Sequence, residues 1–371
     1  MFGGSRHLAL AAPAIKGEAR AWPSPFDPAM TDVLALKGHK VCVLASGDPF
    51  LHGVGVTLAR QLDPDACEVF PAPSAFSLAA SRLGWALQET ETVSLHARPP
   101  ELLRPLLHPG TRILALTSDG EGPAAIAALL SAHGFGASQL HVLEALGGSS
   151  ERVRALRADA VGNRSFGPLN LVGIEIIAGA DAAILPLGGH LDDALFEHDG
   201  QITKREIRAV TLSALAPRRG ELLWDIGAGA GSIAISWLLM HPGLRAIAIE
   251  ENEERAARIR RNADRLGAPG LEIVQGRAPQ ALNGLATPDA IFIGGGGSDE
   301  GVIDAAIEAL RRGGRLVANA VTTRTEASLL ALQARRGGEL TRIALTRAAP
   351  IGETVGWRPA MPVTQWVWSK K

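Results

Sequence analysis

The chain has 371 residues, of which 46% are hydrophobic and 20% are charged, and its net charge at pH 7 is −1. This length suits two domains, and the composition can fill a core in each, which excludes an intrinsically disordered protein. A near-neutral chain carries no global positive field for non-specific nucleic-acid binding. Two cysteines exclude a disulfide framework and a cysteine-rich zinc site, and no apolar run has the length of a membrane span. We therefore expect a cytoplasmic protein without a metal site.

Apolar runs of strand length alternate with segments of helical period along most of the chain, which is typical of parallel sheets in α/β domains. In chain order, the expected strands are 41–45, 67–70, 112–116, 169–177, 222–226, 246–250, 271–274, 289–293 and 315–320. The alternation breaks between Gly179 and Gly200, a segment with Pro186 and two adjacent glycines. We therefore expect an α/β protein with one domain at 1–182 and a second at 186–371.

Two motifs in the first half follow each other closely. Gly47-Asp48-Pro49 ends an expected strand, and such a turn exposes backbone amides to a ligand. Pro73-Ser74-Ala75 opens an expected helix and places a hydroxyl and free N–H groups at its start, although Asp48 also fits a turn former and Ser74 a simple N-cap. With Leu95-His96-Ala97-Arg98-Pro99 behind them, the motifs resemble the tetrapyrrole (corrin/porphyrin) methylase family, a class III methyltransferase fold. The resemblance implies cofactor contacts at Gly47, Asp48, Ser74 and Ala75.

The beginning of the chain departs from that family. Its members start with a further strand and a glycine-rich loop ahead of a stretch similar to Gly3-Gly4-Ser5-Arg6-His7. By this resemblance the first strand of the first domain is missing, and an unpaired sheet edge would make this domain less stable than the second. An alternative role for the first half is a scaffold that only docks the substrate.

The clearest signal in the second half is an apolar strand, 222–226, which runs into Gly227-Ala228-Gly229-Ala230-Gly231. Glycines let a backbone turn tightly and approach a ligand closely, and the spacing here is one residue shorter than in the usual dinucleotide motif. Asp225 stands just before the turn. Glu250 ends the next strand, where an acid can accept hydrogen bonds from both hydroxyls of a ribose.

Later segments complete this pattern. A loop at 275–279 follows the third strand and would lie over an adenine, four glycines follow the fourth strand, and 310–317 reads as helix end, turn and strand. The series resembles the class I S-adenosylmethionine-dependent methyltransferases, which have a Rossmann-like fold; a dinucleotide-binding Rossmann domain is the alternative. The resemblance implies S-adenosylmethionine as the cofactor, with contacts at Asp225, Gly227, Ala228, Gly229, Ala230, Gly231, Glu250, Arg277 and Ala278.

The stretch from Leu185 to Arg208 resembles the opening of the decarboxylating precorrin methyltransferase domain of cobalamin synthesis. In that domain the position of Thr203 lies near the cofactor, and from the residues alone Thr203 and Glu206 predict a capping box at a helix start. His198 is a candidate catalytic residue or an ordinary polar loop residue. Asn319 ends an expected strand at the edge where α/β sheets bind ligands, so it is a second candidate for the catalytic site.

The order of the two halves resembles the bifunctional, decarboxylating precorrin methyltransferases. This implies methylation of a carboxylate-bearing tetrapyrrole at carbon 5 by the first domain. It also implies methylation at carbon 15, with loss of the ring C acetate carboxyl group, by the second domain. The alternative is an RNA methyltransferase, because the second domain also resembles tRNA adenine methylases, but the neutral charge argues against it. We expect a homo-oligomer with no nucleic-acid or membrane partner.

Overall fold

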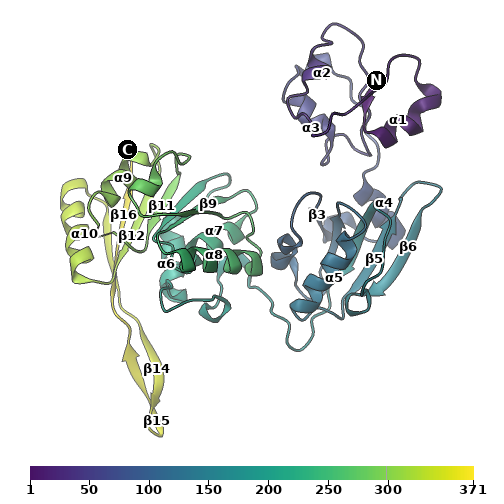
Figure 1. Ribbon diagram of the computed structural model, residues 1–371. Coiled ribbons are helices and arrows are strands. Elements are labelled where there is room, and N and C mark those ends of the chain that lie inside the picture. The colour runs from purple at the N-terminus through teal and green to yellow at the C-terminus, as the bar shows by residue number, and fades with distance from the viewer. Residues whose placement is uncertain (298) are drawn as a thin grey trace. The chain divides into compact units, whose positions relative to one another are not determined.

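The computed structural model describes residues 1–297 and 299–371, and its chain divides into two compact units. The first unit contains residues 1–98 and 109–182, and the second contains 99–108 and 183–371 (Figure 1).

A short segment from the first half of the sequence belongs to the second unit. Its 3₁₀ helix, Pro100–Leu106, packs beside α8 (Glu253–Leu266), and Leu103 and Leu107 are fully buried. Gly267 ends α8 with a φ of +85°, and a Cβ at this position would lie 2.7 Å from Cδ of Pro105. Glycine is therefore required here both for the backbone conformation and for the close approach of the segment.

The first 70 residues of the first unit hold little sheet. They contain a two-stranded parallel sheet and three short α-helices: β1 (Phe2–Gly3), β2 (Arg20–Ala21), α1 (Ser5–Ala11), α2 (Thr31–Leu34) and α3 (Val54–Ala59). Two expected strands are wrong. In 41–45 only Val43 pairs, as an isolated bridge with Phe2, and 67–70 forms no strand and leaves Phe70 76% exposed. An apolar run becomes a strand only where a second backbone lies beside it to accept its hydrogen bonds.

The rest of the first unit is a five-stranded sheet with helices α4 (Ala75–Leu83) and α5 (Gly122–Ala132). The strand order is β3 (Thr90–Ser94), β4 (Arg112–Leu116), β7 (Asn170–Glu175), β5 (Gln139–Glu144), β6 (Arg152–Arg157). The expected strands at 112–116 and 169–177 are confirmed, but a parallel sheet is wrong here because only β3 and β4 run parallel. The connection between β5 and β6 is too short for a helical crossover, so these strands must be antiparallel.

The second unit is built on a seven-stranded sheet. Its order is β10 (Glu272–Gln275), β9 (Arg245–Glu250), β8 (Leu222–Ile226), β11 (Ala290–Ile293), β12 (Arg315–Ala320), β16 (Val363–Ser369), β13 (Glu339–Ile343). The first five strands are parallel, as expected, and β16 runs antiparallel to both of its neighbours, β12 and β13. A two-stranded hairpin, β14 (Thr346–Ile351) and β15 (Thr354–Pro359), projects from this sheet (Figure 1).

Side chains alternate between the two faces of this sheet and build a core on each. Leu223 and Phe292 belong to the core with α6 (Arg205–Leu215), α7 (Ser232–Met240) and α8, whereas Trp224 and Ile291 belong to the core with α9 (Val302–Ala309) and α10 (Thr323–Arg336). The result is a three-layer α/β/α sandwich. From β8 the chain passes to β9 on one side and later to β11 on the other, and α/β sheets bind ligands at the carboxyl ends of strands around such a point.

Candidate active site

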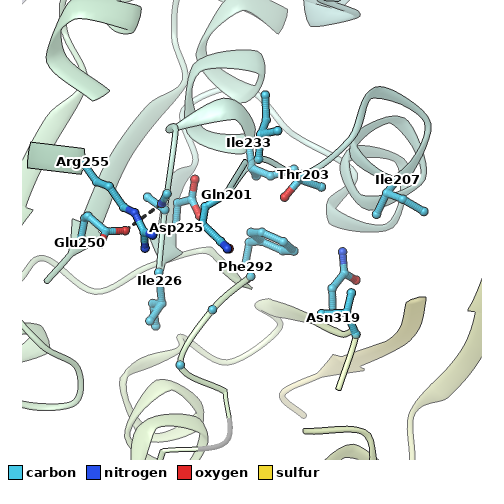
Figure 2. Close-up of a pocket in the computed structure, with 18 of the residues that line it drawn as sticks. Gln201, Thr203, Ile207, Asp225, Ile226, Ile233, Glu250, Arg255, Phe292 and Asn319 are labelled. Carbon is cyan, nitrogen blue, oxygen red and sulfur yellow. Dashed lines mark hydrogen bonds between the residues drawn. The ribbon is translucent and has the colours of Figure 1, made fainter. Parts of the chain in front are cut away.

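A cavity of about 530 Å³ opens at the carboxyl ends of β8, β9, β11 and β12, which is within the usual size range of small-molecule sites. Most of the residues predicted for the second domain line it: Thr203, Asp225, Gly227, Ala228, Gly229, Glu250, Arg277, Ala278 and Asn319. Figure 2 shows Glu250 and Arg255 on one side of the cavity and Asn319 and Ile207 on the other, with Phe292 between them.

The glycine turn brings backbone amides to the cavity. Gly227 and Gly229 have φ angles of +70° and +60°, and a Cβ at either position would lie within 3 Å of the carbonyl oxygen of Gly295 or Gln201. Gly227 N–H donates to the carbonyl of Ile249, which ties the turn to the neighbouring strand. Glycine is therefore required at both positions, and the turn presents bare backbone to a ligand.

The last two residues of the turn do not line the cavity. A Cβ on Gly231 would lie 2.8 Å from Cγ2 of Ile259, and the carbonyl of Ala230 accepts a hydrogen bond from Nδ2 of Asn262 at 3.0 Å. Ile259 and Asn262 are both on α8. These two positions therefore dock the turn onto α8, and any influence on a bound ligand passes through the shape of the turn.

Asp225 is a buried carboxylate with one unused oxygen. Asp225 is 1% exposed, its Oδ2 accepts the N–H of Ala234 at 3.0 Å, and its Oδ1 has no hydrogen-bond partner. Burial raises the pKa of Asp225 to about 7, the N–H of Ala234 acts in the opposite direction, and the charge of Glu250 adds to the rise. A buried acceptor without a partner in a cavity wall fits a cationic group of a ligand.

Glu250 holds the turn and faces the cavity from the end of β9. Oε2 accepts the N–H of Gly229 at 2.8 Å, and Oε1 accepts the N–H of Asn252 at 3.1 Å. Each carboxylate oxygen retains a lone pair after these bonds. The arrangement leaves two acceptors for a vicinal pair of hydroxyls, such as those of a ribose.

Thr203 lines the cavity, but the predicted capping box is wrong. Helix α6 starts at Arg205, Lys204 is its N-cap, and no side chain caps it. The carbonyl of Thr203 instead accepts a hydrogen bond from Nη1 of Arg208 at 2.8 Å, and Glu206 pairs with Arg347. The side chain of Arg208 is 1% exposed and also binds the carbonyl of Leu191, so a buried guanidinium holds the backbone of the loop before α6 in place.

Asn319 is part of a buried polar network. Its Nδ2 donates to Oγ1 of Thr211 at 2.9 Å, and its Oδ1 accepts from Nε2 of Gln365 at 3.0 Å. Nε2 of Gln365 also donates to Oγ1 of Thr211 at 3.2 Å. This network fixes the amide plane and leaves one N–H of Asn319 for a ligand in the cavity.

Two predicted residues contribute less to the site. His198 is exposed, accepts the N–H of Gly200 at its Nδ1, and does not line the cavity. Arg277 lines the rim with a side chain that is 67% exposed, and its Nη2 lies 2.8 Å from Oδ2 of Asp299. Neither position places a group against the cavity interior.

In the first unit, the two predicted motifs lie against each other. A Cβ on Gly47, whose φ is +62°, would lie 3.0 Å from the carbonyl oxygen of Pro73. Ser74 is the N-cap of α4, as expected, and its Oγ accepts the N–H of Ser77 at 3.1 Å; Ala75 is the first residue of that helix. Oδ1 of Asp48 accepts the N–H of Phe50 at 2.8 Å, as a turn-forming aspartate does.

The sequence analysis missed several cavity residues: Gln201, Lys204, Arg255, Phe292 and Arg347. Phe292 could have been found, because it sits near the carboxyl end of a predicted strand. Arg347 could not, because it comes from the β14–β15 hairpin, far along the chain from the glycine turn and the two acids that marked the site in the sequence. Among residues 1–297 and 299–371, no cluster of His, Cys, Asp or Glu could hold a metal ion. No helix in the same part of the chain is long and apolar enough to cross a membrane.

Comparisons with known proteins match both halves of the chain. The Precorrin methyltransferase domain family matches residues 194–370, and the Tetrapyrrole (Corrin/Porphyrin) Methylases family matches residues 28–161. The precorrin-6Y C(5,15)-methyltransferase [decarboxylating] of a Sinorhizobium species is 61% identical over 370 residues, which cover 100% of this chain and 90% of that protein.

One shorter protein and one separately crystallised domain match about half of the chain. The cobalt-precorrin-6B C(15)-methyltransferase (decarboxylating) of Salmonella typhimurium is 35% identical over 166 residues, 44% of this chain and 85% of that protein. The crystal structure of the C-terminal domain of precorrin-6Y C5,15-methyltransferase from Rhodobacter capsulatus is 48% identical, covers 50% of this chain and 98% of that one, and has a TM-score of 0.47. The full-length match confirms the resemblance and sets aside a dinucleotide-binding domain: the chain belongs to the family of decarboxylating precorrin-6Y C(5,15)-methyltransferases.

Proposed function

We propose that this chain transfers methyl groups from S-adenosylmethionine to carbons 5 and 15 of a precorrin and removes one acetate carboxyl group as carbon dioxide. The observation that carries the cofactor assignment is that two acids, Asp225 and Glu250, line the same cavity. Oδ1 of Asp225 is a buried acceptor without a partner, which fits the ammonium of the methionine part, and Glu250 fits the ribose hydroxyls. Family membership supports the substrate and the reaction.

The sulfonium of S-adenosylmethionine supplies a methyl group that is already electrophilic, so the protein's task is to orient the two reactants and exclude water. The Gly227–Gly229 turn and Glu250 hold the nucleoside side of the cavity, and Asn319 offers a fixed N–H on the opposite side. Phe292 lies between these sides and supplies an apolar wall (Figure 2). In this arrangement, the nucleophilic carbon of the macrocycle lies at the Asn319 side of the cavity.

We assign methylation of carbon 15 and the decarboxylation to the second unit, and methylation of carbon 5 to the first. The Salmonella relative supports this division, because its name carries only the C(15) activity and decarboxylation and it matches 44% of the chain. The Precorrin methyltransferase domain match, which lies at 194–370, also supports it. In the decarboxylation, the bond to the carboxyl carbon breaks, its electron pair enters the conjugated macrocycle, and a proton later takes the place of the carboxyl group.

The test is to incubate the full chain with a precorrin-6 substrate and S-adenosylmethionine and to analyse the products by mass spectrometry. The expected product carries two added methyl groups and lacks one carbon dioxide, and a reaction without S-adenosylmethionine is the control. Methyl transfer to tRNA transcripts with no change in the tetrapyrrole would refute the proposal and support the RNA methyltransferase alternative.

A further inference from the structure

The cavity end farthest from Glu250 is bounded by the base of the β14–β15 hairpin. Leu345, Ala360 and Met361 line the cavity there, and they are the residues just before β14 and just after β15. Val321 and Val363 complete an apolar wall on the same side. A wide, flat organic molecule that reacts next to Asn319 would therefore lie against the hairpin base.

Two cations line this end of the cavity, and their ion pairs are partly exposed to solvent. Arg347 pairs with Glu206, and the two side chains are 48% and 35% exposed. Nζ of Lys204 lies 3.9 Å from Oδ2 of Asp193, and the Lys204 side chain is 43% exposed. Solvent-exposed ion pairs contribute little free energy, so a carboxylate of a ligand can replace the protein's own carboxylate at small cost.

The register of the hairpin places a second guanidinium beside Arg347. Arg347 and Arg358 are directly opposite each other in the antiparallel pair β14–β15, so their side chains share one face of the hairpin. Among the residues that the structure describes, no carboxylate forms an ion pair with Arg358, and its Nη2 donates to the carbonyl of Pro350 at 3.4 Å. Two like charges at opposed positions destabilise a bare hairpin, and an anion between them removes that repulsion.

The other two arginines of the cavity, Arg255 and Arg277, lie at the Glu250 end, away from Asn319 (Figure 2). Nε of Arg255 lies 2.8 Å from Oδ2 of Asp199, and the hydrogen bond to Arg255 lowers the pKa of that carboxyl. Arg277 pairs with Asp299 at the nucleoside rim. A substrate anion that approaches Asn319 therefore meets Lys204 and Arg347 rather than these two arginines.

We propose that Arg347, assisted by Arg358 and Lys204, binds a peripheral carboxylate of the tetrapyrrole, and that Arg347 releases Glu206 when it does so. The proposal rests on the proposed function, which supplies a substrate with several carboxylate groups. A guanidinium fork matches a carboxylate with two parallel hydrogen bonds, and the apolar wall at Leu345 and Met361 contacts the macrocycle itself. Glu206 acts as a stand-in anion that keeps Arg347 at the cavity in the absence of substrate.

The test compares Arg347→Gln and Glu206→Gln with the control Arg312→Gln in the full chain. Arg312 is exposed, makes the same change of charge, and lies before β12, at the edge of the sheet opposite the cavity. The readouts are the KM and kcat for the precorrin, from carbon dioxide release, and the Kd for S-adenosylmethionine, from calorimetry. Arg347→Gln should raise the KM about tenfold or more, because it removes a charged bond to the substrate, and should leave the Kd unchanged.

Glu206→Gln should change the KM in the opposite direction. It removes the competing carboxylate, so the KM should fall, by up to about fivefold for an exposed pair. An unchanged KM in Arg347→Gln, or a change of the same size in Arg312→Gln, would overturn the carboxylate site. An unchanged or higher KM in Glu206→Gln would overturn the exchange of partners. A wild-type chain that releases no carbon dioxide from the precorrin would instead refute the proposed function, whatever the variants do.

Discussion

Replacement of Asp225 by asparagine should stabilise the ligand-free protein at neutral pH and at the same time weaken cofactor binding. Asparagine keeps the shape of the side chain and can still accept the N–H of Ala234, but it cannot ionise. In the wild type, burial raises the pKa of Asp225 from 3.8 to about 7. The folded protein therefore holds a proton at this position over a pH range in which the unfolded chain has lost it.

The sign and size of the effect follow from that difference. Below pH 3.8 the carboxyl is protonated in both states and has no effect on stability. Between pH 3.8 and about 7 the unfolded state binds fewer protons, so the free energy of unfolding falls as the pH rises, and above pH 7 the loss is complete. A shift of this size corresponds to about 4 kcal/mol. The amide N–H₂ of asparagine, placed where Oδ1 has no partner, costs about 1–3 kcal/mol at every pH.

The assay is urea unfolding of wild type and Asp225→Asn from pH 4 to pH 8, with calorimetric titration of S-adenosylmethionine at pH 8. The difference in free energy of unfolding should move in favour of the variant by about 4 kcal/mol between these pH values. Cofactor binding should weaken by about 2 kcal/mol, because the ammonium loses a charged partner. A stability difference that stays constant from pH 4 to pH 8 would refute a raised pKa at Asp225. Unchanged cofactor affinity would refute its role as the ammonium acceptor.

Three further variants test the remaining parts of the site. Gly229→Arg places a side chain at a φ of +60° and a Cβ 2.9 Å from the carbonyl of Gln201. It should therefore abolish carbon dioxide release while methylation of carbon 5 continues, as measured by mass spectrometry of the products. Continued carbon dioxide release would refute our assignment of the decarboxylation to the second unit. Glu250→Gln should weaken S-adenosylmethionine binding by about 1–3 kcal/mol in calorimetry, whereas an unchanged affinity would remove the ribose contact. Arg208→Leu leaves the carbonyls of Leu191 and Thr203 without a donor, and urea unfolding should show a loss of about 3 kcal/mol; a loss below 1 kcal/mol would mean that the loop has other support.

Those parts of the site that depend on local chemistry could be predicted from the sequence. The turn at Gly227–Gly229 needs positive φ angles, and only glycine adopts these at low cost, so the residue types report the conformation directly. Asp225 and Glu250 lie at the carboxyl ends of adjacent parallel strands, and parallel pairing brings such ends together at one edge. Each inference needed a strand, its end and its neighbour, which are all local in the chain.

The parts that depend on distant partners could not be predicted. Glu206 and Thr203 have the spacing of a capping box, but Arg347, which binds Glu206, is 141 residues away in the sequence. The buried guanidinium of Arg208 donates a hydrogen bond to the Thr203 carbonyl, and helix α6 begins at Arg205. In the first unit, 67–70 has the composition of a strand and lacks a neighbouring backbone to pair with. A sequence pattern predicts which secondary structure a segment can form, and the segments that lie beside it in the fold determine which one it adopts.

A comparison within one strand shows why Asp225 marks the ligand edge of the sheet. Glu221, just before β8, is also buried, but Arg315 binds both of its oxygens, at 2.9 and 2.6 Å. Burial acts to raise the pKa of Glu221, yet the bonds from Arg315 and from the N–H of Arg218 together outweigh it, and the pKa is lowered. Asp225, four residues further, receives one backbone N–H and no cation among the described residues. The fold neutralises the acid at the amino end of the strand and leaves the acid at the carboxyl end for a cation that the protein itself does not supply.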